Sequence, residues 1–556
     1  MAGEIVRFRS LWALGVAGVL LAGALAPAVH AADVTNSYNV YWSGIKGGEP
    51  SIGYDKTRNV AIYGQTDVAR LAWDDTQPGH PMTTTDITPP FIDSLDPITT
   101  VDPYNDRLYT SQLLGACSNL YISDDAGASY THSTLGCGVG AVLDHQTVGS
   151  GPFHTPVPPI LYPNAVYYCA QNGYSESCGV SLDGGGTFGP AIPISNAPGL
   201  TDLNDSNLTF KLQGGACGGL TGHLKVGPEG TAYVPINGCG GTLSLNNLTN
   251  QEYVGGQPSL SVSEDSGVTW PDIRRVEYPG VSNPNESDPS LGIAVDGTLY
   301  FGWENGVNPS DFKNGDETQA MISISHDRGL TWTPPVDVSS PLGLHNVQFP
   351  EVIAGDADRA AFAFLGTRGI GDDQANAYPN PGEPRDWYLY ISTTYDGGQT
   401  WTTVNATPDK PVQRGCIDLQ GIAPGSPRED VCSQRNLLDF NDMTVDPMGR
   451  VLVAYGDGCT EDECVLDPNG PSSGSVDNVA RQTCGRGLYA AHDAEFNDAT
   501  CLAGPTAVDT TPVPPTPLPN TRAVGGLLPW LMVIAGLVVA LALALPGVAR
   551  RRPRRS

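Results

Sequence analysis

Two repeated patterns predict that this sequence folds as an all-β protein whose small sheets are arranged in a ring, a β-propeller. One pattern is a tight turn that occurs five times, and the other is a pair of short strands that occurs seven times. Recurring units of this kind are typical of architectures in which each unit completes the core of its neighbour. The seven strand pairs predict seven blades, with six blades as the alternative.

The turn motif reads Ser/Thr-x-Asp-x-Gly-x-x-aromatic. Its five aspartates are Asp125, Asp183, Asp265, Asp327 and Asp396. We expect each carboxylate to accept hydrogen bonds from nearby backbone amides, each glycine to adopt a positive φ, and each aromatic side chain to cover the turn. The five aspartates are therefore interpreted as structural rather than catalytic.

The second pattern is a strand, a turn with Asp, Gly or Pro, and a strand rich in β-branched and aromatic residues. The seven copies lie at residues 50–63, 97–109, 160–168, 224–234, 289–300, 350–364 and 443–455. We expect them to form the inner strands of the blades, with the turn motif on the outer strands. In the first and last blades, which lack the motif, residues 71–73 and 487–489 are expected as outer strands. The segment Tyr38–Tyr41 is expected to pair with the last blade and to close the ring, which removes an open sheet edge.

The N-terminal segment predicts export. Arg7 and Arg9 precede an apolar run, and Val29-His30-Ala31 supplies the small residues of a cleavage site, so residues 1–31 are assigned to a signal peptide. Residues 32–504 are assigned to the propeller.

The C-terminal segment predicts anchoring at the cell surface. Residues 505–526 form a Pro/Thr-rich spacer that contains an LPxT-like sequence, 527–549 an apolar transmembrane helix, and 550–556 a basic cytoplasmic tail. The spacer resembles a Gram-positive sorting signal, although Arg522 stands where that signal has glycine. Attachment through a single membrane span and attachment to the cell wall therefore both remain open.

Charge and cysteine content narrow the class further. A formal net charge of −30 argues against a nucleic acid partner. All 12 cysteines lie after the signal peptide. An even number of cysteines in an exported protein indicates disulfides. Pairing of sequence neighbours predicts Cys117–Cys137, Cys169–Cys178, Cys217–Cys239, Cys416–Cys432, Cys459–Cys464 and Cys484–Cys501.

The five turns and the strand pairs resemble the BNR/Asp-box propellers of the sialidase superfamily. The resemblance implies the propeller fold and a surface protein that meets glycans. Sialidases also carry an arginine triad, a Tyr–Glu nucleophile pair, an Asp acid/base and an Arg-Ile-Pro motif. This sequence contains no Arg-Ile-Pro, so no catalytic residue is transferred from the family.

Candidate functional residues lie where the innermost strands are expected to begin, around the axis. Five carboxylates are catalytic candidates, namely Glu49, Asp96, Asp288, Glu351 and Asp442, and two imidazoles, His154 and His223, are binding candidates. Such a ring can bind a cation such as calcium or hold an acid/base pair for glycoside cleavage. The alternative is that these side chains cap strand ends.

Four further binding candidates are expected in loops on the same face: Arg368, Arg435, Trp303 and Trp387. Aromatic residues beside carboxylates suit stacking on sugars, and they suit packing between blades equally well. Three functions follow as hypotheses. The first is a surface propeller that recognises extracellular glycans or proteins, the second an exo-acting glycosidase of the exo-α-sialidase type, and the third a structural envelope protein.

Overall fold

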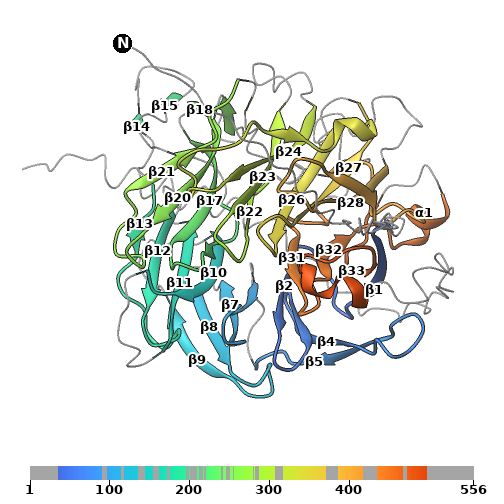
Figure 1. The fold of residues 1–556 in the computed structure, drawn as a ribbon, viewed down its shortest axis with the longest axis horizontal. Coiled ribbons are helices and arrows are strands. Elements are labelled where there is room, and N and C mark those ends of the chain that lie inside the picture. The colour runs from blue at the N-terminus through green and yellow to red at the C-terminus, as the bar shows by residue number, and fades with distance from the viewer. Residues whose placement is uncertain are drawn as a thin grey trace, which may run out of the picture.

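The computed structural model is a seven-bladed β-propeller (Figure 1). It describes residues 35–90, 97–113, 118–135, 144–154, 162–171, 176–195, 199–200, 209–211, 217, 221–239, 242–245, 251–254, 256–279, 281, 287–306, 317–370, 386–417, 435–467 and 472–496. Each blade is a four-stranded core sheet whose strands run from the axis outward in chain order. The last blade follows the same order for its three inner strands, and its outermost strand comes from the N-terminal part of the chain. The predicted fold class and blade number are thereby confirmed.

The innermost strands form a closed ring, because each contacts the innermost strand of the next blade. In order of blades 1 to 7 they are β2 (Ser51–Asp55), β6 (Ile98–Val101), β10 (Asp144–Pro152), β16 (Lys225–Val226), β22 (Ser290–Ile293), β26 (Asn346–Ala354) and β31 (Asp442–Val445). The second strands are β3 (Val60–Gly64), β7 (Leu108–Leu113), β11 (Asn164–Gln171), β17 (Ala232–Cys239), β23 (Leu299–Gly306), β27 (Ala360–Thr367) and β32 (Val451–Asp457).

The outer half of each blade consists of two more antiparallel strands. The third strands are β4 (Val68–Trp73), β8 (Ser118–Ser123), β12 (Glu176–Ser181), β20 (Gln257–Ser263), β24 (Thr318–Ser325), β28 (Asp386–Thr394) and β33 (Val476–Cys484). The fourth strands are β5 (Met82–Asp86), β9 (Thr131–Leu135), β13 (Ile192–Pro193), β21 (Asp272–Arg275), β25 (Val336–Asp337), β29 (Thr402–Asn405) and, in blade 7, β1 (Ser37–Trp42).

A few short elements lie outside this pattern. A small sheet inserted around blade 4 contains β14 (Gly199–Leu200), β15 (Thr209–Lys211), β18 (Thr242–Leu245) and β19 (Gln251–Val254). Strand β30 (Gln413–Arg414) adds to β28 in blade 6. The described helices are single turns: η1 (Ser340–Leu342), α1 (Asp462–Leu466), η2 (Ala490–His492) and α2 (Asp493–Phe496). None of the described helices has the length and apolar composition needed to cross a membrane.

The N-terminal strand closes the ring as predicted. Strand β1 pairs antiparallel with β33, from Ser37 opposite Cys484 to Trp42 opposite Asn478. The hydroxyl and the amide of Ser43 both donate to the carbonyl of Asp477, at 2.7 and 3.0 Å. The first and last strands of the described ring thus belong to one sheet (Figure 1).

The core is divided between neighbouring blades. Seven apolar clusters occur in the described part of the chain, and each contains residues from two adjacent blades. The reason is the two-residue period of a strand. Along β3, Ile62 packs against blade 2 and Tyr63 against blade 7. Every blade therefore buries both of its faces, and no blade has a core of its own.

The five turn motifs connect the third and fourth strands of blades 2 to 6 and share one hydrogen-bonding scheme. In blade 5, Asp327 accepts from the amide of Thr331 at 2.8 Å, from its hydroxyl at 2.6 Å, and from the hydroxyl of Ser325 at 2.8 Å. The four counterparts of Asp327 accept the same hydrogen bond from the Ser or Thr two residues earlier, and these local contacts fit the interpretation of all five as structural.

The glycine of each turn also touches the preceding blade. Gly267 has a φ of +81°, and a Cβ added there would lie 2.8 Å from Cε1 of Tyr167 in β11. A positive φ and a close approach thus both require glycine. The turn motif is therefore a joint between blades as well as a hairpin.

Three predicted disulfides are present: Cys169–Cys178, which joins β11 to β12, Cys217–Cys239 and Cys459–Cys464. Cys416 and Cys484 are also disulfide-bonded, but their expected partners Cys432 and Cys501, like the pair Cys117 and Cys137, lie outside the described residues. The signal peptide, the spacer, the transmembrane helix and the basic tail lie outside them too and stay predictions.

Two strand assignments were wrong. The innermost strand of blade 3 is β10, not the expected segment near residue 160, because β10 is rich in Gly and Ser and has little intrinsic strand propensity. Residues 487–489, expected as an outer strand of the last blade, form no strand. Leu488 packs instead into the core between blades 6 and 7.

The turn contacts lead to a prediction about stability. Asp327→Ala removes the acceptor of three hydrogen bonds, so the free energy of unfolding should fall by about 1–3 kcal/mol. The exposed Asp409, for which the same substitution removes no comparable contact, is the matched control. Chemical denaturation of both variants checks this. Equal stability of Asp327→Ala and Asp409→Ala would show that the turn does not depend on its carboxylate.

Candidate functional site

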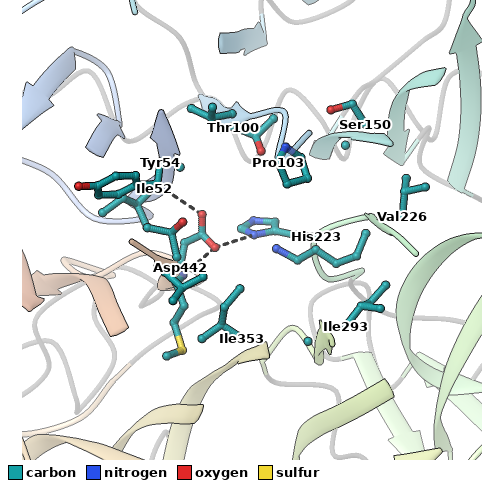
Figure 2. Close-up of a pocket in the computed structure, with 18 of the residues that line it drawn as sticks. Ile52, Tyr54, Thr100, Pro103, Ser150, His223, Val226, Ile293, Ile353 and Asp442 are labelled. Atoms are coloured by element: carbon teal, nitrogen blue, oxygen red, sulfur yellow. Dashed lines mark hydrogen bonds and ion pairs between the residues drawn. The ribbon is translucent and has the colours of Figure 1, made fainter. Parts of the chain in front are cut away.

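A channel of about 330 Å³ runs along the propeller axis and is lined by the innermost strands of all seven blades. We call the end where these strands begin the start face and the opposite end the end face. Ile52, Thr100, Ser150, Ile293 and Ile353 line its wall, each from a different blade (Figure 2). The wall is therefore mainly apolar.

The channel opens toward the end face. Among its lining residues, Tyr104 and Val295 follow the last residues of β6 and β22, and their exposed fractions are 47% and 63%. Lys56, which follows β2, is exposed as well. The mouth thus combines an aromatic ring, an aliphatic side chain and an ammonium group.

At the start face the channel ends on polar side chains. His223 and Asp442 line this end, and their Nδ1 and Oδ1 atoms are 3.5 Å apart (Figure 2). Glu351 completes a group of three residues in which one ligand atom from each lies within 4.8 Å of the others. We call His223, Glu351 and Asp442 the axial triad. It draws on blades 4, 6 and 7.

Backbone and side-chain hydrogen bonds hold the two carboxylates of the triad. Asp442 accepts from the amides of Ile52 and Met443, both at 2.8 Å. Glu351 accepts from the hydroxyl of Ser290 at 2.8 Å, and this hydroxyl in turn accepts from the amide of Val352 at 2.9 Å. Strands from four blades therefore fix the positions of these two groups.

Burial and mutual attraction shift the protonation of the triad in different directions. Burial raises the pKa of Glu351 to about 8. Burial also acts to raise the pKa of Asp442, but the neighbouring His223 outweighs it and the pKa lies below its ordinary value. Burial acts to lower the pKa of His223, whereas Asp442 and Glu351 bring it above its ordinary value.

A second chain of charged groups lies beside the triad. His145 is 3.6 Å from Asp288 through Nδ1 and 3.7 Å from Asp439 through Nε2. Arg435 contacts Asp439 at 2.5 Å and Glu49 at 3.9 Å. Asp288 is buried, and burial raises its pKa although His145 opposes the shift. This chain links the starts of blades 1, 3, 5 and 7.

Of the sequence-predicted ring, the structure brings His223, Asp288, Glu351 and Asp442 together, and Glu49 joins through Arg435. Asp96 lies outside the described residues. His154 lies at the end face rather than the start face, because it follows the end of β10, where its amide donates to Ser266. The corresponding residue at the start of blade 3 is His145, which the sequence analysis missed together with the strand that carries it.

The two tryptophans do not reach the site. Trp303 and Trp387 are fully buried. Their indole N–H groups donate to Oδ1 of Asn305 at 3.2 Å and to the carbonyl of Gly415 at 2.9 Å. Both therefore pack between blades, the alternative that the sequence left open. Arg368 is exposed just after β27.

Glu176 is a further titratable group near the site that sequence reasoning did not find. Glu176 begins β12 and is buried near His145 and Asp288. Burial raises its pKa to about 8. The sequence does not indicate that a glutamate in a strand is buried, because its burial depends on which blade packs over it.

Comparisons with known proteins found only distant structural likenesses. No family model and no curated protein matches the chain. Solved structures that resemble it include an α-L-arabinanase of Penicillium chrysogenum (10% identity, 82% of this chain, 98% of that chain, TM-score 0.34) and a leech intramolecular trans-sialidase (11%, 80%, 70%, 0.32). An Aleuria aurantia lectin is a third (10%, 66%, 96%, 0.32). Likenesses at this level carry no information about ligand or activity.

Glu176 supports a prediction about pH. Its folded pKa lies above the unfolded value of about 4.3, so the folded state loses stability as the pH rises from 4.3 to 8. Glu176→Gln should therefore be more stable than the wild type at pH 9, by on the order of a few kcal/mol, and similar at pH 4. Thermal unfolding across this range measures it.

The control for this experiment is Glu277→Gln, at a glutamate whose side chain is 67% exposed. Its unfolding profile should follow the wild type at every pH. If the stability of Glu176→Gln also changed with pH as that of the wild type does, ionisation of Glu176 would not destabilise the folded protein.

Proposed function

We propose that this protein is a recognition propeller that binds a terminal sugar unit of an extracellular glycan in its axial channel. The observation that carries the proposal is the channel itself. Its volume of about 330 Å³ lies at the lower end of the range for ligand pockets, and it combines apolar walls with a few polar groups at its closed end. Tyr104 at the mouth offers a ring face for stacking.

The setting of the protein is part of the same proposal. The five Asp turns support membership of the Asp-box propellers, and the predicted signal peptide and membrane span support export and anchoring at the cell surface. In such a position the propeller would meet glycans of the surroundings. The acidic composition is in keeping with neutral or basic ligands rather than strongly acidic ones.

Arginine placement argues against the sialidase mechanism. No arginine lines the axial channel among the described residues. Arg435 is engaged with Asp439 and Glu49, and Arg368 stands apart at the end of β27. A site for the carboxylate of sialic acid would need several arginines that converge on one point.

Glycan binding can be tested directly on a glycan array, with Ile293→Trp as the variant that fills the channel. Ile293 lines the channel and is only partly buried, so the larger side chain can extend into it. We expect affinity for the best glycan to fall at least about tenfold. Val336→Trp, on the outer strand β25, is the control and should bind like the wild type.

Two results would contradict the proposal. One is the absence of any bound glycan with the folded wild type. The other is equal binding by Ile293→Trp and the wild type, which would place the binding surface elsewhere on the propeller. A melting temperature for each variant distinguishes a blocked channel from a disrupted fold.

Glycoside hydrolysis is the second candidate function, and the triad favours it. The nearest oxygens of Glu351 and Asp442 lie within 4.8 Å, which is close to the spacing of about 5 Å in retaining glycosidases. A raised pKa on Glu351 and a lowered one on Asp442 are also the shifts expected of an acid and a nucleophile.

Fluorogenic glycosides, including a sialoside, test this second function. Because the channel opens away from the triad and Glu351 does not line it, we expect no turnover above the uncatalysed rate. Turnover that Glu351→Gln abolishes, and that Asp327→Ala leaves unchanged in the folded protein, would replace recognition by catalysis as the function.

A further inference from the structure

We propose that the axial triad, His223, Glu351 and Asp442, binds a divalent transition metal ion, with Zn²⁺ as the expected ion. The inference stands apart from glycan recognition, since it concerns the closed end of the channel and needs no sugar. It rests on the donor set, on the spacing of the donors and on the hydrogen bonds around them.

The donor set matches such an ion better than it matches calcium. One imidazole and two carboxylates from three blades lie within 4.8 Å of one another, and this is the single such group among the described residues. Calcium takes six to eight oxygen ligands, whereas three protein ligands that include an imidazole suit zinc with one position left for water. His223 thus moves the expectation away from the calcium that the sequence suggested.

The spacing within the triad fits a shared ion. Nδ1 of His223 and Oδ1 of Asp442 are 3.5 Å apart, longer than the usual N–H···O hydrogen bond of about 2.7–3.2 Å. Two ligand atoms that are each about 2.1 Å from one tetrahedrally coordinated ion would be about 3.4 Å apart. A metal ion between these two atoms therefore accounts for their distance without rearrangement of either side chain.

Unpartnered buried atoms point to the same place. The Nε2 atom of His223 is buried and makes no hydrogen bond with any residue in the described ranges. The Oδ1 atom of Asp288, a residue that is 4% exposed and that interacts electrostatically with His223, also has no such partner there. Leaving polar groups like these buried and unpaired is costly. An ion bound through Nδ1 would leave Nε2 as the ring nitrogen that needs a separate partner, such as a water molecule, as is usual for histidine ligands of metals.

The surroundings of the triad resemble the outer shell of a metal site. The amides of Ile52 and Met443 orient Asp442, and the Ser290 hydroxyl orients Glu351. Hydrogen bonds of this kind hold ligating carboxylates in place. Because His223 and Asp442 line the channel, the remaining coordination position would face its interior.

The rival explanation is an ion-pair network without metal. Lys225 and a protonated His223 lie close enough to Glu351 and Asp442 to balance their charges. The two explanations differ in an observable way, because a network needs no ion and a metal site takes up one equivalent.

Metal content and metal titration of the purified protein test the proposal. After EDTA treatment and its removal, we expect calorimetric titration with ZnCl₂ to show one equivalent bound, and Co²⁺ to give visible absorption bands of a low-symmetry site. Glu351→Gln and His223→Gln should each lose about 100-fold in affinity or more. Ser290→Ala, which removes only the positioning hydroxyl, should lose about tenfold.

The matched control is His345→Gln. His345 and Glu317 form another histidine–carboxylate pair, 2.8 Å apart and partly exposed, and the part of the chain that the structure describes adds no third metal ligand to it. This variant should bind zinc like the wild type. Circular dichroism and melting temperature in EDTA show whether each variant is folded. Should Glu351→Gln not fold, the titration of Ser290→Ala and the Co²⁺ spectrum still decide the question.

Several outcomes would overturn the metal site. They are the lack of a stoichiometric equivalent in the wild type, unchanged affinity in Glu351→Gln, and an equal loss in His345→Gln. Lack of uptake together with lower stability of Glu351→Gln would establish the ion-pair network instead. Failure on the glycan array leaves these measurements unaffected, so the two proposals can fail independently.

Discussion

The sharing of hydrophobic core between neighbouring blades is the constraint on which the rest of this structure depends. The second strands are buried on both faces, and alternate residues of each belong to different interfaces, as Ile62 and Tyr63 do in β3. A blade at an open end would leave one such face in water. Ring closure by β1 is therefore a condition for burying the first and last interfaces, and the glycines of the Asp turns allow the blades to approach closely enough.

The same constraint creates the site. Seven inner strands converge on one axis, and their side chains leave a channel at the centre. Residues at the strand starts are then forced together, whatever their charge. Asp288 and Glu351 are buried there beside the largely covered His223, and burial together with neighbouring charges shifts the pKa values of all three. A functional group on this axis is held by strands from several blades at once, which makes its geometry rigid.

Local patterns were enough to predict the architecture, and long-range contacts decided the details of the site. The Asp turns and the strand pairs are short-range signals with direct physical causes, and they predicted seven blades and the ring closure. His154 was misplaced and His145 missed because the Gly- and Ser-rich strand β10 carries no such signal. The burial of Trp303 and Trp387 and the raised pKa of Glu176 depend on neighbouring blades, whose packing no local pattern records.

The position of β1 has a consequence for how the chain reaches its native state. The strand that completes the last blade precedes the whole ring in sequence, and its partner β33 follows nearly all of it. During synthesis, the first strand must wait unpaired until the last has been made. Pairing of strands that lie so far apart in the sequence is slow, and until it occurs an exposed edge strand can pair with strands of other chains. Assembly of this propeller is thus expected to finish in one late step, and truncation within the last blade would leave all the earlier blades in an open, aggregation-prone ring.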